Sequence, residues 1–244
     1  MRNILPALGL VGVLWLSPAA VRAQSVELTM DIFTSSVLSQ TTTLLNNNAV
    51  MAATRNAEAE KRGGTAAAAK RSVNLAYTPT PALRQQTVQN LARQVQARNA
   101  AAGQAITNAF GPGKADYNQL FSEMVKESGL PANNVATAFA AYLEVAYVIV
   151  NNVPEASVTA TMDRALQRQA TGIVSRNSTL TSPAAVAKLG EELKLQAVML
   201  YVGWQTAKKN GQEAQFKSSI ANTFKSKGLD LGAVQLTANG LVKK

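Results

Sequence analysis

The chain has 244 residues, a net charge of +10 at pH 7, and neither histidine nor cysteine. The lack of an imidazole base and of a thiolate excludes Ser-His-Asp and Cys-His hydrolases, ordinary zinc sites and haem held by histidine. Carboxylate, lysine or tyrosine chemistry remains, or no catalysis. We expect neither a metal nor a cofactor.

Residues 1–23 have the pattern of a secretory signal peptide. Arg2 supplies a short positive segment, residues 4–16 are apolar, and Val21-Arg22-Ala23 suits a signal peptidase. We therefore expect export, to the periplasm or the medium, with cleavage after Ala23. The mature chain would keep a net charge of +8, because only Arg2 and Arg22 are lost among the charged residues.

Residues 24–78 are predicted to form a polar, low-complexity leader that is partly helical and partly mobile. Polar runs at 41–43 and 46–48, the pair Gly63-Gly64 and an alanine run at 66–69 are a composition that packs poorly. Thr78-Pro79-Thr80-Pro81 then enforces an extended chain and allows a helix to begin. We place one helical domain at residues 79–244.

Helical spacing runs through the first half of this domain. Helices are expected over about 82–98 and over 100–110, the second stopped by Gly111-Pro112-Gly113. The next helix has the clearest apolar stripe, at i, i+3, i+4, i+7 and i+8 from Tyr117. A nearly all-apolar helix from Asn133 or Asn134 to about Asn151 should lie at the centre. Its apolar run is shorter than the roughly 20 residues of a membrane span, so we expect no transmembrane span in the mature chain.

The second half continues in the same way. One helix is predicted to begin at Pro154 and Glu155 and to run to about Ile173, and another to run from Ser182-Pro183 to Asn210-Gly211. A last helix ends before Gly228, and residues 233–236 are at most a short strand. The predicted fold class is therefore all-α: a single bundle of about six or seven helices after the leader.

Two glutamates are weak candidates for catalysis. Glu144 has apolar neighbours, but a helical wheel places it opposite Val135 and Phe139, which favours a polar face or an ion pair at the edge of the bundle. Glu123 could act with Glu127 as an acid/base pair or a Ca²⁺ ligand, although a solvated helix face is the simpler interpretation. Glu191-Glu192, early in its helix, is interpreted as complementing the helix dipole.

A basic stretch without acidic residues separates Glu60 from Asp116. It holds the candidates for contact with an anionic surface: Lys61, Arg62, Lys70, Arg71, Arg84, Arg93 and Arg98. Arg84 and Arg93 fall on opposite sides of their helix and so form no single stripe. Few rings are available there for base stacking, and we do not expect nucleic acid as the partner.

Aromatic side chains offer a third kind of site. Tyr142 and Trp204, together with Tyr147 and Tyr201, could line a ligand pocket between helices. Aromatic residues at helical spacing also serve simply as core, and both interpretations stay open.

Two groups of short motifs carry a resemblance. Tyr77-Thr78-Pro79-Thr80-Pro81 opens the helical domain, while Gly228-Leu229-Asp230-Leu231 and Leu236-Thr237-Ala238-Asn239-Gly240 lie near its end. With the signal peptide and polar leader, this layout resembles a family of uncharacterised exported bacterial proteins, a domain of unknown function. The resemblance spans roughly residues 77–242. It implies an exported all-helical protein and no particular activity or site residues.

These observations leave three hypotheses. The leading one is an exported, non-enzymatic envelope or secreted protein that binds a partner protein or an anionic envelope polymer or lipid. The first alternative is a carboxylate-dependent hydrolase of cell-wall glycans, with Glu144 or Glu123 as the acid. The second is a helical protein that binds a small ligand or lipid near Tyr142 and Trp204.

Overall fold

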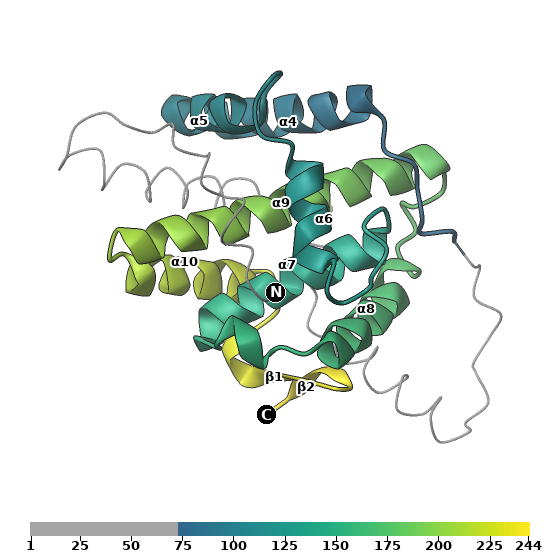
Figure 1. Ribbon diagram of the computed structural model, residues 1–244, viewed down its shortest axis with the longest axis vertical. Coiled ribbons are helices and arrows are strands. Elements are labelled where there is room, and N and C mark those ends of the chain that lie inside the picture. The colour runs from purple at the N-terminus through teal and green to yellow at the C-terminus, as the bar shows by residue number, and fades with distance from the viewer. Residues whose placement is uncertain (1–72) are drawn as a thin grey trace.

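Seven α-helices and a C-terminal β-hairpin make up residues 73–244, the part of the chain that the computed structural model describes (Figure 1). This confirms the all-α prediction within those residues. The elements in order are α4 (Pro81–Gln96), α5 (Ala100–Phe110), α6 (Tyr117–Val125), α7 (Val135–Asn151), the 3-10 turn η1 (Glu155–Ser157), α8 (Ala160–Val174), α9 (Pro183–Lys209), α10 (Glu213–Ser226), the 3-10 turn η2 (Leu231–Ala233), β1 (Val234–Thr237) and β2 (Gly240–Lys243).

Side-chain caps set the beginnings of the main helices. The Thr80 hydroxyl accepts from the Leu83 N–H at 3.1 Å, and the Asn134 side chain accepts from the Ala136 N–H at 2.9 Å. Ser182 caps α9 in the same way, with Pro183 as the first helical residue. Each cap satisfies an N–H group that has no partner within the helix. The starts predicted at Asn134 and at Ser182-Pro183 are confirmed.

The helix predicted to begin at Pro154 is shorter than expected. Asn152 ends α7 in the left-handed conformation, with φ of 51°, and Pro154 is extended. Only the single turn η1 follows, and α8 begins at Ala160, where the Thr159 hydroxyl accepts from the Met162 N–H at 3.3 Å. The prediction of a helix from Pro154 was therefore wrong, because the better N-cap comes five residues later. Glu155 consequently lies on a short turn between two helices.

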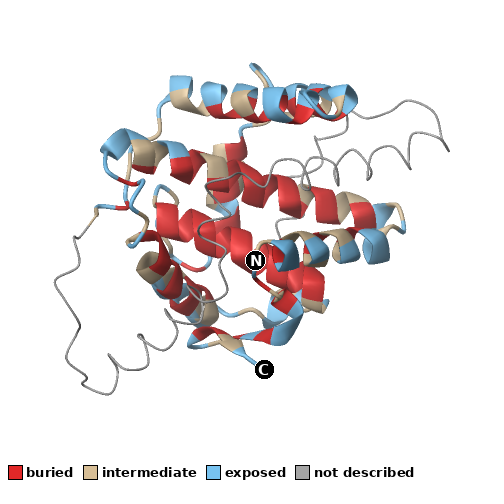
Figure 2. Ribbon diagram, turned by 180° about the vertical axis from the view of Figure 1, so that it is seen from behind, coloured by how far each residue is buried: buried red, intermediate tan, exposed pale blue. Residues whose placement is uncertain are grey.

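Helix α7 lies at the centre of the domain. Every residue from Val135 to Val150 is buried, and α7 contacts α8, α9 and α10 (Figure 2). This confirms the prediction of a central buried helix. Among the described residues, no helix combines the length and the apolar character needed to cross a membrane.

The two ends of the domain are built differently. Helices α4 and α5 contact each other and cover α9 at one end, while the β-hairpin lies against α8 at the other (Figure 1). In the hairpin, Val234 faces Lys243 and Thr237 faces Gly240. The Gln169 side chain of α8 accepts from the Leu241 N–H at 2.8 Å and donates to the Leu241 carbonyl at 3.0 Å, as a neighbouring strand would.

The chain already packs against the domain before residue 79. The Tyr77 N–H donates to the Asn133 carbonyl, and the Val135 N–H donates to the Leu75 carbonyl, both at 3.0 Å. The Leu75 side chain is buried. Residues 73–78, which the sequence assigned to the leader, are therefore part of the folded unit in the structure.

A buried ion pair on α9 joins several of these elements. Lys194 and Glu191 lie 3.0 Å apart with both side chains 0% exposed. The Lys194 ammonium also donates to the side-chain oxygens of Asn118 and Asn133, at 2.7 and 2.6 Å. Burial lowers the pKa of Lys194, and the neighbouring Glu191 carboxylate opposes that shift. The pair takes part in a network of hydrogen bonds that compensates for removing both charges from water.

Two tyrosines complete this network. The Tyr77 hydroxyl donates to Glu191 Oε1 at 2.8 Å, and the Tyr117 hydroxyl donates to Oε2 at 2.7 Å. Burial and the Glu191 charge raise the pKa of both phenols, so both stay protonated and can donate. The interpretation of Glu191 as a residue that only complements the helix dipole is therefore wrong, since its carboxylate lies in the core.

Replacing Lys194 tests how much the fold depends on this network. Lys194→Met leaves the Glu191 charge buried without its cation, so we expect the free energy of unfolding to fall by about 3–5 kcal/mol. Lys188→Met, at an exposed position of the same helix, should change it by less than about 0.5 kcal/mol. Urea unfolding followed by circular dichroism measures both. The double variant Lys194→Met/Glu191→Gln should lose less than Lys194→Met alone; an equal or larger loss would contradict the role of the charge.

Candidate functional site

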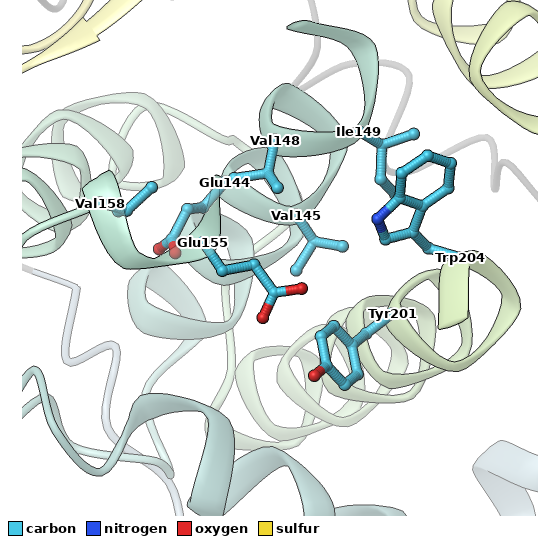
Figure 3. Close-up of a pocket in the computed structure, with 8 residues that line it drawn as sticks. All are labelled: Glu144, Val145, Val148, Ile149, Glu155, Val158, Tyr201 and Trp204. Carbon is cyan, nitrogen blue, oxygen red and sulfur yellow. The ribbon is translucent and has the colours of Figure 1, made fainter. Parts of the chain in front are cut away.

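A pocket lies between α7, α9 and the segment that follows α7. About 280 Å³ of space lies inside it when open solvent is counted, and the part that side chains enclose has room for about one water molecule. Its lining residues are Glu144, Val145, Val148, Ile149, Glu155, Val158, Tyr201 and Trp204 (Figure 3). It therefore combines an aliphatic wall with two aromatic rings and two carboxyl groups.

Helical spacing brings these side chains together. The α7 residues are one turn apart along one side of the helix, and Tyr201 and Trp204 are separated by three residues on α9. Glu155 and Val158 come from η1 and the residue after it. In Figure 3 the Glu155 carboxylate points toward Tyr201, while Trp204 lies beside Ile149. The early end of α7 and the late start of α8 are what place Glu155 at this pocket.

Glu144 is buried, with 5% of its surface exposed. The expectation that it lies on a polar face or at the edge of the bundle is wrong, because the side of α7 opposite Val135 is covered by other parts of the protein. Burial raises the pKa of Glu144 well above its ordinary value, and the charges of Asp163 and Glu155 raise it further. A proton is therefore held on Glu144 at pH values where an exposed glutamate has lost it.

Asp163 of α8 is the neighbour that explains part of this shift. Asp163 is 5% exposed, and its Oδ2 atom accepts a short hydrogen bond from the Ser128 hydroxyl. Its other oxygen, Oδ1, receives no hydrogen bond from an N–H or O–H donor. A proton on Glu144 supplies that missing bond, since the two side chains are within hydrogen-bond reach. Glu144 and Asp163 thus form a pair of neighbouring carboxyl groups between α7 and α8.

A second group of charges lies at Glu155. Its Oε1 atom accepts from Gln205 Nε2 at 3.2 Å and lies 3.6 Å from the Lys208 ammonium. The same ammonium lies 5.6 Å from the centroid of a Trp204 ring. Burial and the Glu155 charge raise the pKa of Tyr201 to about 12. This part of the pocket therefore already holds a cation between a carboxylate and an aromatic ring.

The structure separates the two aromatic residues that the sequence proposed for one pocket. Trp204 lines the pocket described above. Tyr142 does not, because it is 1% exposed in the core between α7 and α10, where its ring lies 5.3 Å from that of Phe224. Burial raises the pKa of Tyr142. Tyr142 is therefore a core residue. Tyr201, and not Tyr142, lines the pocket together with Trp204.

The remaining candidates lie outside the pocket. Glu123 is exposed on α6, where its carboxylate lies 3.3 Å from the Lys126 ammonium. Of the basic candidates, Arg84 pairs with Asp116 at 3.0 Å, Arg93 donates to the Asn90 side chain at 2.6 Å, and Arg98 is exposed. Lys61, Arg62, Lys70 and Arg71 lie outside the described residues.

The sequence pattern around Asp163 indicates that this residue is buried. Asp163 precedes Leu166, Ala170 and Ile173 at the spacing of one apolar stripe. An acid on such a stripe is expected to be buried and to need a partner. Ser128 and Glu155 lie on turns and give no comparable pattern, so only the fold could place them at the site.

The side chains that line this site determine which groups it can bind. In residues 73–244 no group of three or more histidine, cysteine, aspartate or glutamate side chains is arranged to hold a metal ion. The aliphatic wall favours an apolar group, and the Glu155 carboxylate and the two rings favour a positive charge. The buried Glu144 carboxyl group can hold a proton.

Fold and site together describe an all-helical protein with a small aromatic-lined pocket beside buried carboxyl groups. The chain belongs to the family of unknown function DUF6683, whose family profile matches residues 8–244. The match confirms the resemblance to an uncharacterised family and covers more of the chain than the motifs did. No curated protein and no solved structure matches the chain.

The Glu144 proton should make stability depend on pH. Because the folded state raises the pKa of Glu144 above 4.5, its contribution is complete below about pH 4.5 and is lost as the pH rises through the folded value. Glu144→Gln carries no such proton. Between pH 4.5 and pH 8 the free energy of unfolding of this variant should therefore rise relative to that of the parent chain.

Urea unfolding at pH 4.5, 6 and 8 measures this difference. Glu123→Gln is the matched control, because its carboxylate is exposed and should shift the comparison by less than about 0.5 kcal/mol. Parallel pH profiles for Glu144→Gln and the parent chain would rule out the buried proton.

Proposed function

We propose that the protein is an exported, non-enzymatic binding protein and that the pocket between α7 and α9 holds its ligand. The observation that carries this proposal is the composition of the pocket: an aliphatic wall, the rings of Tyr201 and Trp204, and few polar groups. Small-molecule sites in proteins have this character. Of the three hypotheses from the sequence, the ligand-binding one thus receives the most support from the geometry.

The hydrolase alternative receives less support. Glu144 has the raised pKa of a general acid. The residue is, however, only 5% exposed, and its carboxyl group interacts with Asp163, so a glycosidic oxygen could reach it only after rearrangement of α7 and α8. Glu123, the other candidate acid, lies on an exposed helix face beside Lys126.

The anionic-surface version of the leading hypothesis rests on charge alone. The guanidinium of Arg84 is occupied by Asp116, and Arg93 bonds to Asn90. Binding to a partner protein or to an anionic envelope component therefore remains a hypothesis that the net charge supports and the described geometry does not specify.

Export is supported by the pattern of residues 1–23. When the full chain is expressed in bacteria, N-terminal sequencing of the protein recovered outside the cytoplasm should begin at Gln24. Leu10→Arg places a charge in the apolar segment and should keep the chain in the cytoplasm at its full mass. Recovery of the uncut parent chain from the cytoplasm alone would contradict export.

Trp204 gives a direct test of binding. Of the two tryptophans, Trp15 lies in the predicted signal peptide and Trp204 in the pocket, so the chain that begins at Gln24 emits from the pocket alone. We expect saturable changes in its emission on titration with a six-carbon probe, either 1-hexanol, hexylammonium or hexanoate. Val158→Phe, which fills the pocket, should abolish the change, whereas Val153→Phe, at a partly buried position that does not line it, should not. No response to any of the three probes would contradict the proposal.

A further inference from the structure

The cation beside the pocket belongs to the protein itself. Lys208 follows Trp204 by one turn of α9, and its ammonium contacts both the Trp204 ring and the Glu155 carboxylate, at 5.6 and 3.6 Å. A cation held over an indole ring next to a carboxylate is the arrangement by which proteins recognise ammonium groups. The structure therefore shows that this position accepts a positive charge.

Glu155 is the carboxylate at the rim of the pocket. The other carboxyl group in the lining, Glu144, is held protonated by burial and by the neighbouring charges of Asp163 and Glu155. The Glu155 carboxylate pairs with Lys208 and accepts from Gln205. The charge complementarity at the rim is therefore the one that Lys208 itself uses: a cation beside Glu155 and the Trp204 ring.

The Lys208 ammonium is held only weakly between Trp204 and Glu155. Its side chain is 36% exposed and that of Glu155 is 27% exposed, and partly exposed ion pairs contribute little to stability. The lysine stem is long and flexible, so its ammonium can move into solvent without disturbing α9. An incoming cation can therefore take its place while the helix stays where it is.

We propose that the ligand is an organic ammonium ion with a short apolar tail, which binds by replacing the Lys208 ammonium between Trp204 and Glu155. The tail then contacts the aliphatic wall formed by Val145, Val148 and Ile149, whose side chains move apart to admit it because the resting pocket has room for about one water molecule. This inference rests on the proposed binding function and names the ligand class for it.

Three six-carbon probes separate the contribution of the head group from that of the tail. Hexylammonium, 1-hexanol and hexanoate are titrated into the chain that begins at Gln24, with Trp204 emission as the readout. Hexylammonium should bind with a Kd about tenfold lower than that of 1-hexanol, and hexanoate should bind more weakly than either. Hexylammonium and 1-hexanol carry the same hexyl tail, so a difference between their affinities comes from the head group.

Two variants test the residues that the proposal names. Glu155→Gln should raise the Kd for hexylammonium about tenfold and leave that for 1-hexanol unchanged. Lys208→Met removes the competing ammonium and should lower the Kd for hexylammonium about threefold to tenfold. The matched controls are Glu213→Gln and Lys209→Met, which make the same charge changes at exposed positions, and each should stay within about twofold of the parent chain. Thermal melts confirm that every variant is folded.

The outcomes distinguish the two proposals. Equal affinity for hexylammonium and 1-hexanol, or no effect of Glu155→Gln, would overturn the ammonium assignment while leaving a binding pocket. Tighter binding of hexanoate would overturn it in favour of an anionic ligand. A lack of response to all three probes would remove the proposed function itself.

Discussion

The ion pair between Glu191 and Lys194 connects parts of the chain that are distant in the sequence. Its oxygen and nitrogen atoms bond to Tyr77 before α4, to Tyr117 and Asn118 of α6, and to Asn133 before α7. Two charges without water require such partners. The backbone beside the pair fits the same arrangement, because a Cβ on Gly190 would lie 2.2 Å from the Tyr77 ring. The pair thus fixes the N-terminal segment and α6 on α9, and with them one side of α7.

The position of the pocket follows from this arrangement. Helix α7 is enclosed along its length. The chain turns away from it at its end, where Asn152 adopts the left-handed conformation and Pro154 is extended. The segment from Asn152 to Thr159 then crosses beside α9 before α8 begins. Its single helical turn carries Glu155 to Tyr201 and Lys208. The same break that shortens α8 therefore supplies the acidic side of the pocket.

Local physical rules predicted the helices well and the buried polar groups poorly. Caps and apolar spacing are properties of neighbouring residues, so Asn134, Ser182-Pro183 and the core helix α7 could be predicted. A helical wheel gave the direction of Glu144 correctly relative to Val135, but one helix cannot show which neighbour covers that direction. Glu191 and Lys194 look like an ordinary surface pair at i and i+3. Their burial depends on Tyr77, Tyr117 and Asn133, which are 114, 74 and 61 residues from their partners.

The Lys194 network and the Glu144–Asp163 pair differ in how completely their polar atoms are hydrogen-bonded. Around Lys194 the ammonium and both Glu191 oxygens have hydrogen-bond partners, which is how proteins treat charges that serve only the fold. At Asp163 one oxygen receives no N–H or O–H donor, and the adjoining Glu144 completes the bond only while it holds a proton. Glu144 also lines the pocket. A proton, or a nearby cation, can therefore alter the balance of charges at the pocket. In the Lys194 network, by contrast, the hydrogen bonds are already complete.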